Sequence, residues 1–155
     1  MIQKVKYSIS DLQNSSDEEL ISLVYDKATE LYLETFGKWK YYYSNGKYKG
    51  GGKYVNGKRN GEWKWFHQNG KLHQIGQFSD DEQTGEWNFF HPNGNRQGIG
   101  TLINGQRTGI WKWYFTNGQI QTERKWIDGK LIEIISCYDG KGNEMDKGTL
   151  KNGNG

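Results

Sequence analysis

The 155-residue chain is long enough for one domain, yet only 33% of its residues are hydrophobic, whereas 15% are aromatic and 22 are glycines. This composition is too aromatic for a disordered segment and is typical of a turn-rich antiparallel sheet. The net charge is +3, and the single cysteine excludes an intrachain disulfide. No apolar run is long enough for a signal peptide or a membrane span, so we expect a cytoplasmic protein.

Residues 1–36 differ from the rest of the chain. They contain three lysines and seven acidic residues, a net charge of −4, which leaves +7 for residues 37–155. Ser16 with acids at 17–19 is typical of a helix start, and apolar residues follow at helical spacing. We expect a cap segment with a helix over about 17–35; the alternation from Glu30 to Glu34 leaves a β-hairpin as the alternative.

A Gly-x-Trp signature recurs every 24 residues from residue 37 onward, at Gly37, Gly61, Gly85 and Gly109. It predicts repeats that start near residues 37, 61, 85, 109 and 133, the last of them degenerate. A fixed period of this length is typical of arrays that present long binding surfaces. Residues 37–155 therefore form the predicted repeat array.

Two columns of turn residues divide each repeat. The first contains Asn45-Gly46, Asn69-Gly70, Asn93-Gly94 and Asn117-Gly118, and the second contains Asn56-Gly57, Asp80-Asp81, Asn104-Gly105 and Asp128-Gly129. Asn-Gly between two strands favours a two-residue type I′ turn. The fold class predicted is mainly β, an antiparallel β-meander solenoid of about five 24-residue hairpins. Its register sets His67 opposite Leu72, Trp65 opposite Gln74 and Trp63 opposite Gly76.

One row of tryptophans with glycines between them is the predicted structural core. A glycine leaves room for an indole to lie over the neighbouring strand. The residues of this row are Trp39, Trp63, Trp87, Trp111, Gly52, Gly76 and Gly100.

Further aromatic columns are the candidate partner-binding residues. Tyr41, Trp65, Phe89 and Trp113 share the face of the tryptophan row, and Tyr42, Phe66, Phe90 and Tyr114 point to the other face. Either the sheet rolls up to bury one face, or one face binds a partner. Lys64 and Lys112 lie between the aromatic residues and are further candidates, although we expect no nucleic acid because lysines also keep a two-sided sheet soluble.

No motif indicates catalysis, a cofactor or a metal. His67 and His91 share a column but are expected about 9.6 Å apart, too far for one metal ion, and His73 is expected on the opposite face from His67. Asp80 and Asp81 are interpreted as a solvated turn, and Cys137 as a small core residue in the column of Trp113. The chain is therefore not expected to be an enzyme.

The segment Asn56 to Trp63, NGKRNGEW, and more loosely Asn104 to Trp111, resembles the MORN repeat in the variant of bacterial YwqK-like antitoxin proteins. The resemblance covers residues 37–155. It implies a protein-binding module, most specifically an immunity or antitoxin protein that binds a cognate toxin. Alternatives are a MORN scaffold on an anionic membrane, to which the +7 array would be attracted, and a carbohydrate or cell-wall binding module.

Overall fold

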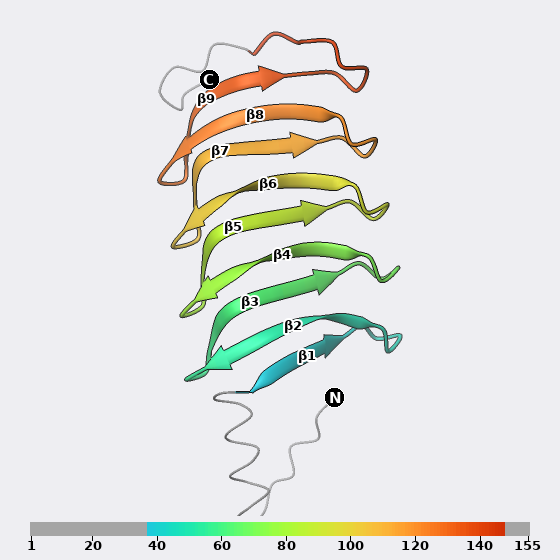
Figure 1. The fold of residues 1–155 in the computed structure, drawn as a ribbon, viewed down its shortest axis with the longest axis vertical. Coiled ribbons are helices and arrows are strands. Elements are labelled where there is room, and N and C mark those ends of the chain that lie inside the picture. Colours follow the sequence, from blue (N-terminus) through green and yellow to red (C-terminus); the bar gives the residue numbers. More distant parts are fainter. Residues whose placement is uncertain (1–36, 148–155) are drawn as a thin grey trace, which may run out of the picture.

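The computed structural model describes residues 37–147, which form one antiparallel sheet (Figure 1). Its nine strands stack in chain order, and no helix occurs among these residues. The strands are β1 (Lys38–Tyr42), β2 (Tyr48–Val55), β3 (Lys58–Phe66), β4 (Leu72–Ser79), β5 (Glu82–Phe90), β6 (Arg96–Ile103), β7 (Gln106–Tyr114), β8 (Ile120–Ile127) and β9 (Lys130–Cys137). The predicted meander is confirmed; the predicted cap segment lies outside the described residues.

The turns at one edge of the sheet are the predicted two-residue turns. Both central residues of each turn have positive φ, as at Asn56 (52°) and Gly57 (73°), and Asp80 (50°) and Asp81 (73°). Val55 pairs with Lys58 and Ser79 with Glu82, so nothing separates the strands except the two turn residues. This is the type I′ geometry, whose twist matches that of the flanking strands.

The other edge has longer loops, and here the prediction of two-residue turns is wrong. The amide of His67 donates to Lys71 O at 2.8 Å, that of Gly70 donates to His67 O at 2.9 Å, and only Gly70 has positive φ. This is a three-residue loop, a type I turn followed by a glycine bulge. Trp65 and Trp63 keep their predicted partners, but Phe66, rather than His67, pairs with Leu72.

The longer loop also changes where His73 lies. Because Trp65 pairs with Gln74 and Phe66 with Leu72, His73 is an extra residue with no residue directly opposite. Its ring centroid is 4.4 Å from that of His67. The prediction that the two rings lie on opposite faces is therefore wrong, and the bulge is the reason.

A bulge in every second strand explains the Gly-x-Trp signature. Lys53 pairs with Asn60 and Gly51 with Lys64, so the three residues 61–63 stand opposite Gly52 alone. Gly61 has a φ of 71°, a conformation that glycine adopts without strain. The same pattern sets residues 85–87 opposite Gly76 and 109–111 opposite Gly100. The bulge bends each strand and folds its tryptophan over the glycine of the preceding strand.

The core lies on one face of the sheet. Trp63, Trp87 and Trp111 are 1%, 0% and 1% exposed, whereas Trp39 is half-buried. The ring of Phe78 packs edge-on between two of these tryptophans, since its centroid is 5.9 Å from that of Trp63 and 5.3 Å from that of Trp87. Burial of an indole removes about 150–250 Å² from water, so this row supplies most of the apolar stabilisation of a hydrophilic chain.

The last hairpin lacks the signature and its bulge together. Glu133 and Ile135 occupy the positions of the glycine and the tryptophan, and Arg124 occupies that of the underlying glycine. Arg124 pairs with Ile134 and Lys125 with Glu133, so no three-residue bulge forms. In this hairpin the tryptophan and the glycine that would lie beneath it are thus both replaced.

Hydrogen bonds between the long loops tie each repeat to the next. His67 Nε2 lies 2.8 Å from Phe90 O, and His91 Nε2 lies 2.9 Å from Tyr114 O. The Asn69 side-chain amide donates to Pro92 O at 2.7 Å, and that of Asn93 donates to Thr116 O at 2.6 Å. The predicted histidine column is therefore a structural link between repeats.

Candidate binding surface

The second aromatic column lies over the buried tryptophans. The centroids of Trp63 and Trp65 are 5.5 Å apart with nearly parallel rings, and those of Trp111 and Trp113 are 5.6 Å apart. Phe89 is 6.1 Å from Trp87 in the same way. Trp65, Phe89 and Trp113 are half-buried and pack against the core, so each has one ring face inside and part of its surface in solvent. We call this row and the groups around it the aromatic face; Tyr41, 39% exposed, continues it on β1.

The remaining candidate residues lie on the opposite face. Phe66 contacts Tyr48 at 5.3 Å between centroids, and Tyr42 contacts Tyr48 at 5.8 Å. Phe90 and Tyr114 occupy the same column and are half-buried. Lys64 and Lys112 alternate with the tryptophans along β3 and β7 and therefore share this opposite face. The structure does not bring the two sets of candidates into one site.

Both candidate lysines have acidic partners. Lys64 Nζ is 2.7 Å from Glu62 Oε1, and Lys112 Nζ is 2.7 Å from Glu123 Oε1. Hydrogen bonding to Lys112 holds the pKa of Glu123 below its usual value, and the same pair raises the pKa of Lys112. The pair of Lys64 and Glu62 is exposed and therefore contributes little to stability, whereas Glu123 is half-buried.

Two arginines that the sequence analysis did not select belong to the aromatic face. Arg59 lies over the Phe78 ring, 4.1 Å from its centroid. Arg107, two repeats further on, lies over Trp126 at 4.9 Å, Trp111 at 5.0 Å and Trp113 at 5.4 Å. A planar guanidinium stacks well on an aromatic ring. The 48-residue spacing of the two arginines, each beside a Gly-x-Trp signature, was the signal available in the sequence.

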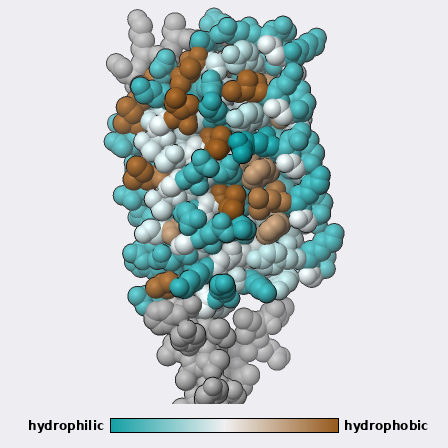
Figure 2. All heavy atoms as spheres, viewed as in Figure 1, coloured by the Kyte–Doolittle hydropathy of each residue, from teal (hydrophilic) through white to brown (hydrophobic). Residues whose placement is uncertain are grey.

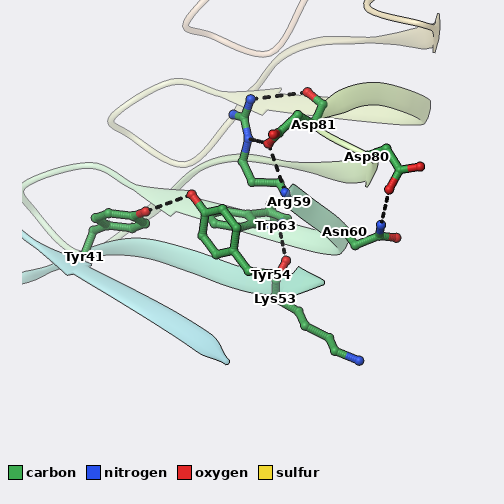
Figure 3. Close-up of polar contacts among 8 residues, drawn as sticks. All are labelled: Tyr41, Lys53, Tyr54, Arg59, Asn60, Trp63, Asp80 and Asp81. Atoms are coloured by element: carbon green, nitrogen blue, oxygen red, sulfur yellow. Dashed lines mark hydrogen bonds and ion pairs between the residues drawn. The ribbon is translucent and has the colours of Figure 1, made fainter. Parts of the chain in front are cut away.

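Arg59 has a counter-charge within the chain (Figure 3). Its Nε is 2.8 Å from Asp81 Oδ1, its backbone amide donates to the same oxygen at 2.9 Å, and its guanidinium also donates to Asp81 O at 3.3 Å. These hydrogen bonds from Arg59 hold the pKa of the Asp81 carboxyl below its usual value. The turn 80–81 is therefore not merely solvated, as the sequence suggested, because Asp81 pairs with a neighbouring repeat.

Arg107 has no such partner. None of the ion pairs among residues 37–147 includes Arg107 or Arg124. Burial, and the charge of Arg124 nearby, lower the pKa of Arg107. The aromatic face thus contains one neutralised arginine, Arg59, and a half-buried neighbouring pair, Arg107 and Arg124, that has no ion pair among the described residues.

Hollows flank both arginines. One of about 270 Å³ is lined by Arg59, Trp63 and Trp65 together with Tyr41, Tyr54 and Lys49. Another, of about 410 Å³, includes Arg107, Phe89, Trp111 and Trp126 in its lining. The larger hollow therefore combines an aromatic wall with a cation.

Tyr54 and Tyr41, which line the smaller hollow, share a hydrogen bond of 3.2 Å between their hydroxyl groups (Figure 3). The burial of Tyr54, followed by this hydrogen bond, raises its pKa to about 12.

The space-filling view shows how hydrophobic residues are distributed (Figure 2). In that view they form small groups separated by hydrophilic residues; some of these groups reach the left edge, whereas the right edge is hydrophilic. Exposed aliphatic side chains on the sheet include Ile103 (55%), Ile110 (53%) and Ile127 (49%). No large continuous apolar patch is visible from that side.

Residues 37–147 contain no group of three His, Cys, Asp or Glu side chains that could hold a metal ion. Cys137 is half-buried and pairs with Thr122 across strands β8 and β9. Residues 37–147 include no helix that is long and apolar enough to cross a membrane.

Comparison with known proteins finds one family model that is similar to part of the chain. The family model described as "MORN repeat variant" matches three consecutive segments, residues 59–80, 83–104 and 107–128. The matched segments begin at equivalent positions of the repeat, which are occupied by Arg59, Gln83 and Arg107. Repeats of this family generally act in binding and not in catalysis. No curated protein matches the chain.

Proposed function

We propose that the protein is a non-catalytic binding module that holds a protein partner on its aromatic face. The observation that supports this most strongly is the row of Trp65, Phe89 and Trp113, half-exposed and each stacked on a fully buried tryptophan. Aromatic and arginine side chains dominate binding hot spots, and rings already fixed by packing lose little entropy when a partner docks.

The partner that we propose is a toxin, so that the chain acts as an immunity or antitoxin protein. The resemblance of the repeats to those of YwqK-like antitoxins supports this assignment. Binding across the aromatic face would cover the toxin's active site or its entrance. No chemistry by the chain itself is needed, which agrees with a fold built only to present a surface.

The test uses the full chain and the product of the neighbouring gene. Co-expression of the two proteins should restore growth of cells that the neighbouring product alone arrests, and the purified pair should form a complex of defined stoichiometry. Continued arrest would exclude the antitoxin assignment. Formation of a complex with a partner that is not toxic would support the binding module and exclude the assignment of the partner as a toxin.

Substitutions on the two faces locate the interface. Trp65→Ala and Trp113→Ala should abolish the complex while circular dichroism still reports a folded sheet. Tyr48→Ala, an aromatic truncation on the opposite face, is the matched control and should bind normally. The reverse result would place the partner on the opposite face. Sedimentation with anionic vesicles at low salt tests the membrane alternative, and binding that increases with anionic lipid content would favour it.

A further inference from the structure

Three copies of one arrangement follow each other along the aromatic face, which allows a comparison within the molecule. In each copy, the residue 22 positions after Arg59, Gln83 or Arg107 donates its backbone N–H to the carbonyl oxygen of that residue. These contacts are Asp81 to Arg59 at 3.0 Å, Gly105 to Gln83 at 2.9 Å and Gly129 to Arg107 at 3.0 Å. The turn and this hydrogen bond are therefore repeated in all three copies, whereas the side chains differ.

The three copies differ in charge. In the first, Arg59 is neutralised by Asp81. In the second, Gln83 brings no charge and Gly105 no acid, so nothing is left unpaired. In the third, Arg107 has a charge, but Gly129 occupies the place of Asp81 and supplies no carboxylate. Its hollow of about 410 Å³ is lined by both Arg107 and Gly129.

We infer that the third copy binds a carboxylate of the protein partner, an Asp or Glu side chain flanked by apolar residues, where Asp81 sits in the first copy. This inference rests on the proposed function and specifies the partner's chemistry.

The surroundings of Arg107 suit that ligand. Rings of Trp111, Trp113 and Trp126 lie within 5.4 Å of the guanidinium carbon, and among residues 37–147 no acidic side chain forms an ion pair with it. A carboxylate can accept two parallel N–H bonds from a guanidinium. The pKa of Arg107 is lowered by burial and by Arg124, so an anion there would relieve an unfavourable charge. Phe89 and Leu102 complete an apolar wall for the flanking residues.

The experiment uses a synthetic probe and the full chain. The probe is a blocked pentapeptide Gly-Leu-Glu-Leu-Gly, and its control has Gln in place of Glu. Binding is followed by NMR through the arginine Nε–H and tryptophan indole resonances. We expect the Glu peptide to bind at least about tenfold more tightly than the Gln peptide and to shift the Arg107 and Trp126 signals, since a charged carboxylate makes stronger hydrogen bonds to a guanidinium than a neutral amide does.

Variants at Gly129 make the test specific. Gly129→Asp should supply an internal carboxylate, as Asp81 does, and weaken the Glu peptide about tenfold or more, as Arg107→Gln should. Gly129→Asn has the same size without the charge and should bind normally. Asp and Asn both tolerate the positive φ of 76° at this turn, and a Cβ there would meet only Gln106 at 3.7 Å. Asp81→Gly should open the first copy and add a second peptide site at Arg59.

The outcomes separate this inference from the proposed function. Equal binding of the Glu and Gln peptides, or weakening by Gly129→Asn as strong as that by Gly129→Asp, would overturn the carboxylate site. A partner complex that forms normally with Gly129→Asp would also overturn it while leaving the binding module intact. Selective peptide binding with no protein partner found on the aromatic face would instead support the site and count against the proposed function.

Discussion

A side chain on Gly76 would overlap the indole ring of Trp87, because the ring lies directly on the glycine's α-carbon. The same relation joins Gly52 to Trp63 and Gly100 to Trp111. Each glycine faces the tryptophan of one neighbouring strand in the register but is covered by the tryptophan of the other, since Gly76 pairs with Trp63 and lies under Trp87. The row is therefore a chain of interlocking contacts in which Trp63, Trp87 and Trp111 each need a glycine on the preceding strand.

Gly76→Ala should accordingly destabilise the sheet strongly, because the indole of Trp87 would have to leave its position over the strand. Trp87→Ile should destabilise it as well, but the double variant should lose less than the two single losses added together. The last hairpin shows that a larger residue at the glycine position is compatible with Ile135 in place of tryptophan. We expect a coupling of about 1–3 kcal/mol in urea unfolding. Strict additivity would show that the two positions are independent.

Trp87→Ala should cost about 3–5 kcal/mol of unfolding free energy, since it removes an indole that is 0% exposed. Phe89→Ala, two residues along the same strand and half-buried, should cost only about 1–2 kcal/mol. Urea denaturation followed by circular dichroism measures both. Similar losses for the two variants would mean that the aromatic face is as much core as the tryptophan row, and would weaken its assignment as a binding surface.

The stability of the sheet should decrease as the pH falls below about 6.5. Burial, and then the neighbouring His67, lower the pKa of His73, so the folded state resists protonation there. The unfolded state then binds more protons than the folded state as the pH decreases through this range, and unfolding becomes easier. His73→Gln should flatten the dependence between pH 7 and pH 5 in chemical denaturation. An unchanged slope in the variant would show that His73 is not responsible.

The hydrogen-bonded pair of Tyr41 and Tyr54 should be visible in an alkaline titration. Because the pKa of Tyr54 is raised to about 12, its ionisation in the folded protein should occur about two pH units above that of an ordinary tyrosine. The stability associated with neutral Tyr54 is present below pH 10 and is lost as the pH rises toward 12. Absorbance of tyrosinate measures the step, and Tyr41→Phe should lower the pKa. No effect of that substitution would leave burial as the sole cause.

Local chemistry in the sequence was sufficient for much of the fold. The 24-residue period set the strands and their order, and the second turn column produced type I′ turns because Asn, Asp and Gly accept positive φ wherever they occur. The pairing of Trp63 with Gly76 also followed from counting. These features depend on neighbours close in the chain, so a single sequence reveals them.

Contacts across the sheet decided the rest. The loop at Asn69 is one residue longer than expected, which moved His73 beside His67. The bulge at residues 61–63 decided which strand each indole covers, and hence that only one surface of Trp65, Phe89 and Trp113 remains exposed. Arg59 pairs with Asp81, which is 22 positions away on the neighbouring hairpin, whereas Arg107 has no such pair among the described residues. Such relations depend on the accumulated bending of the strands, which no local pattern specifies.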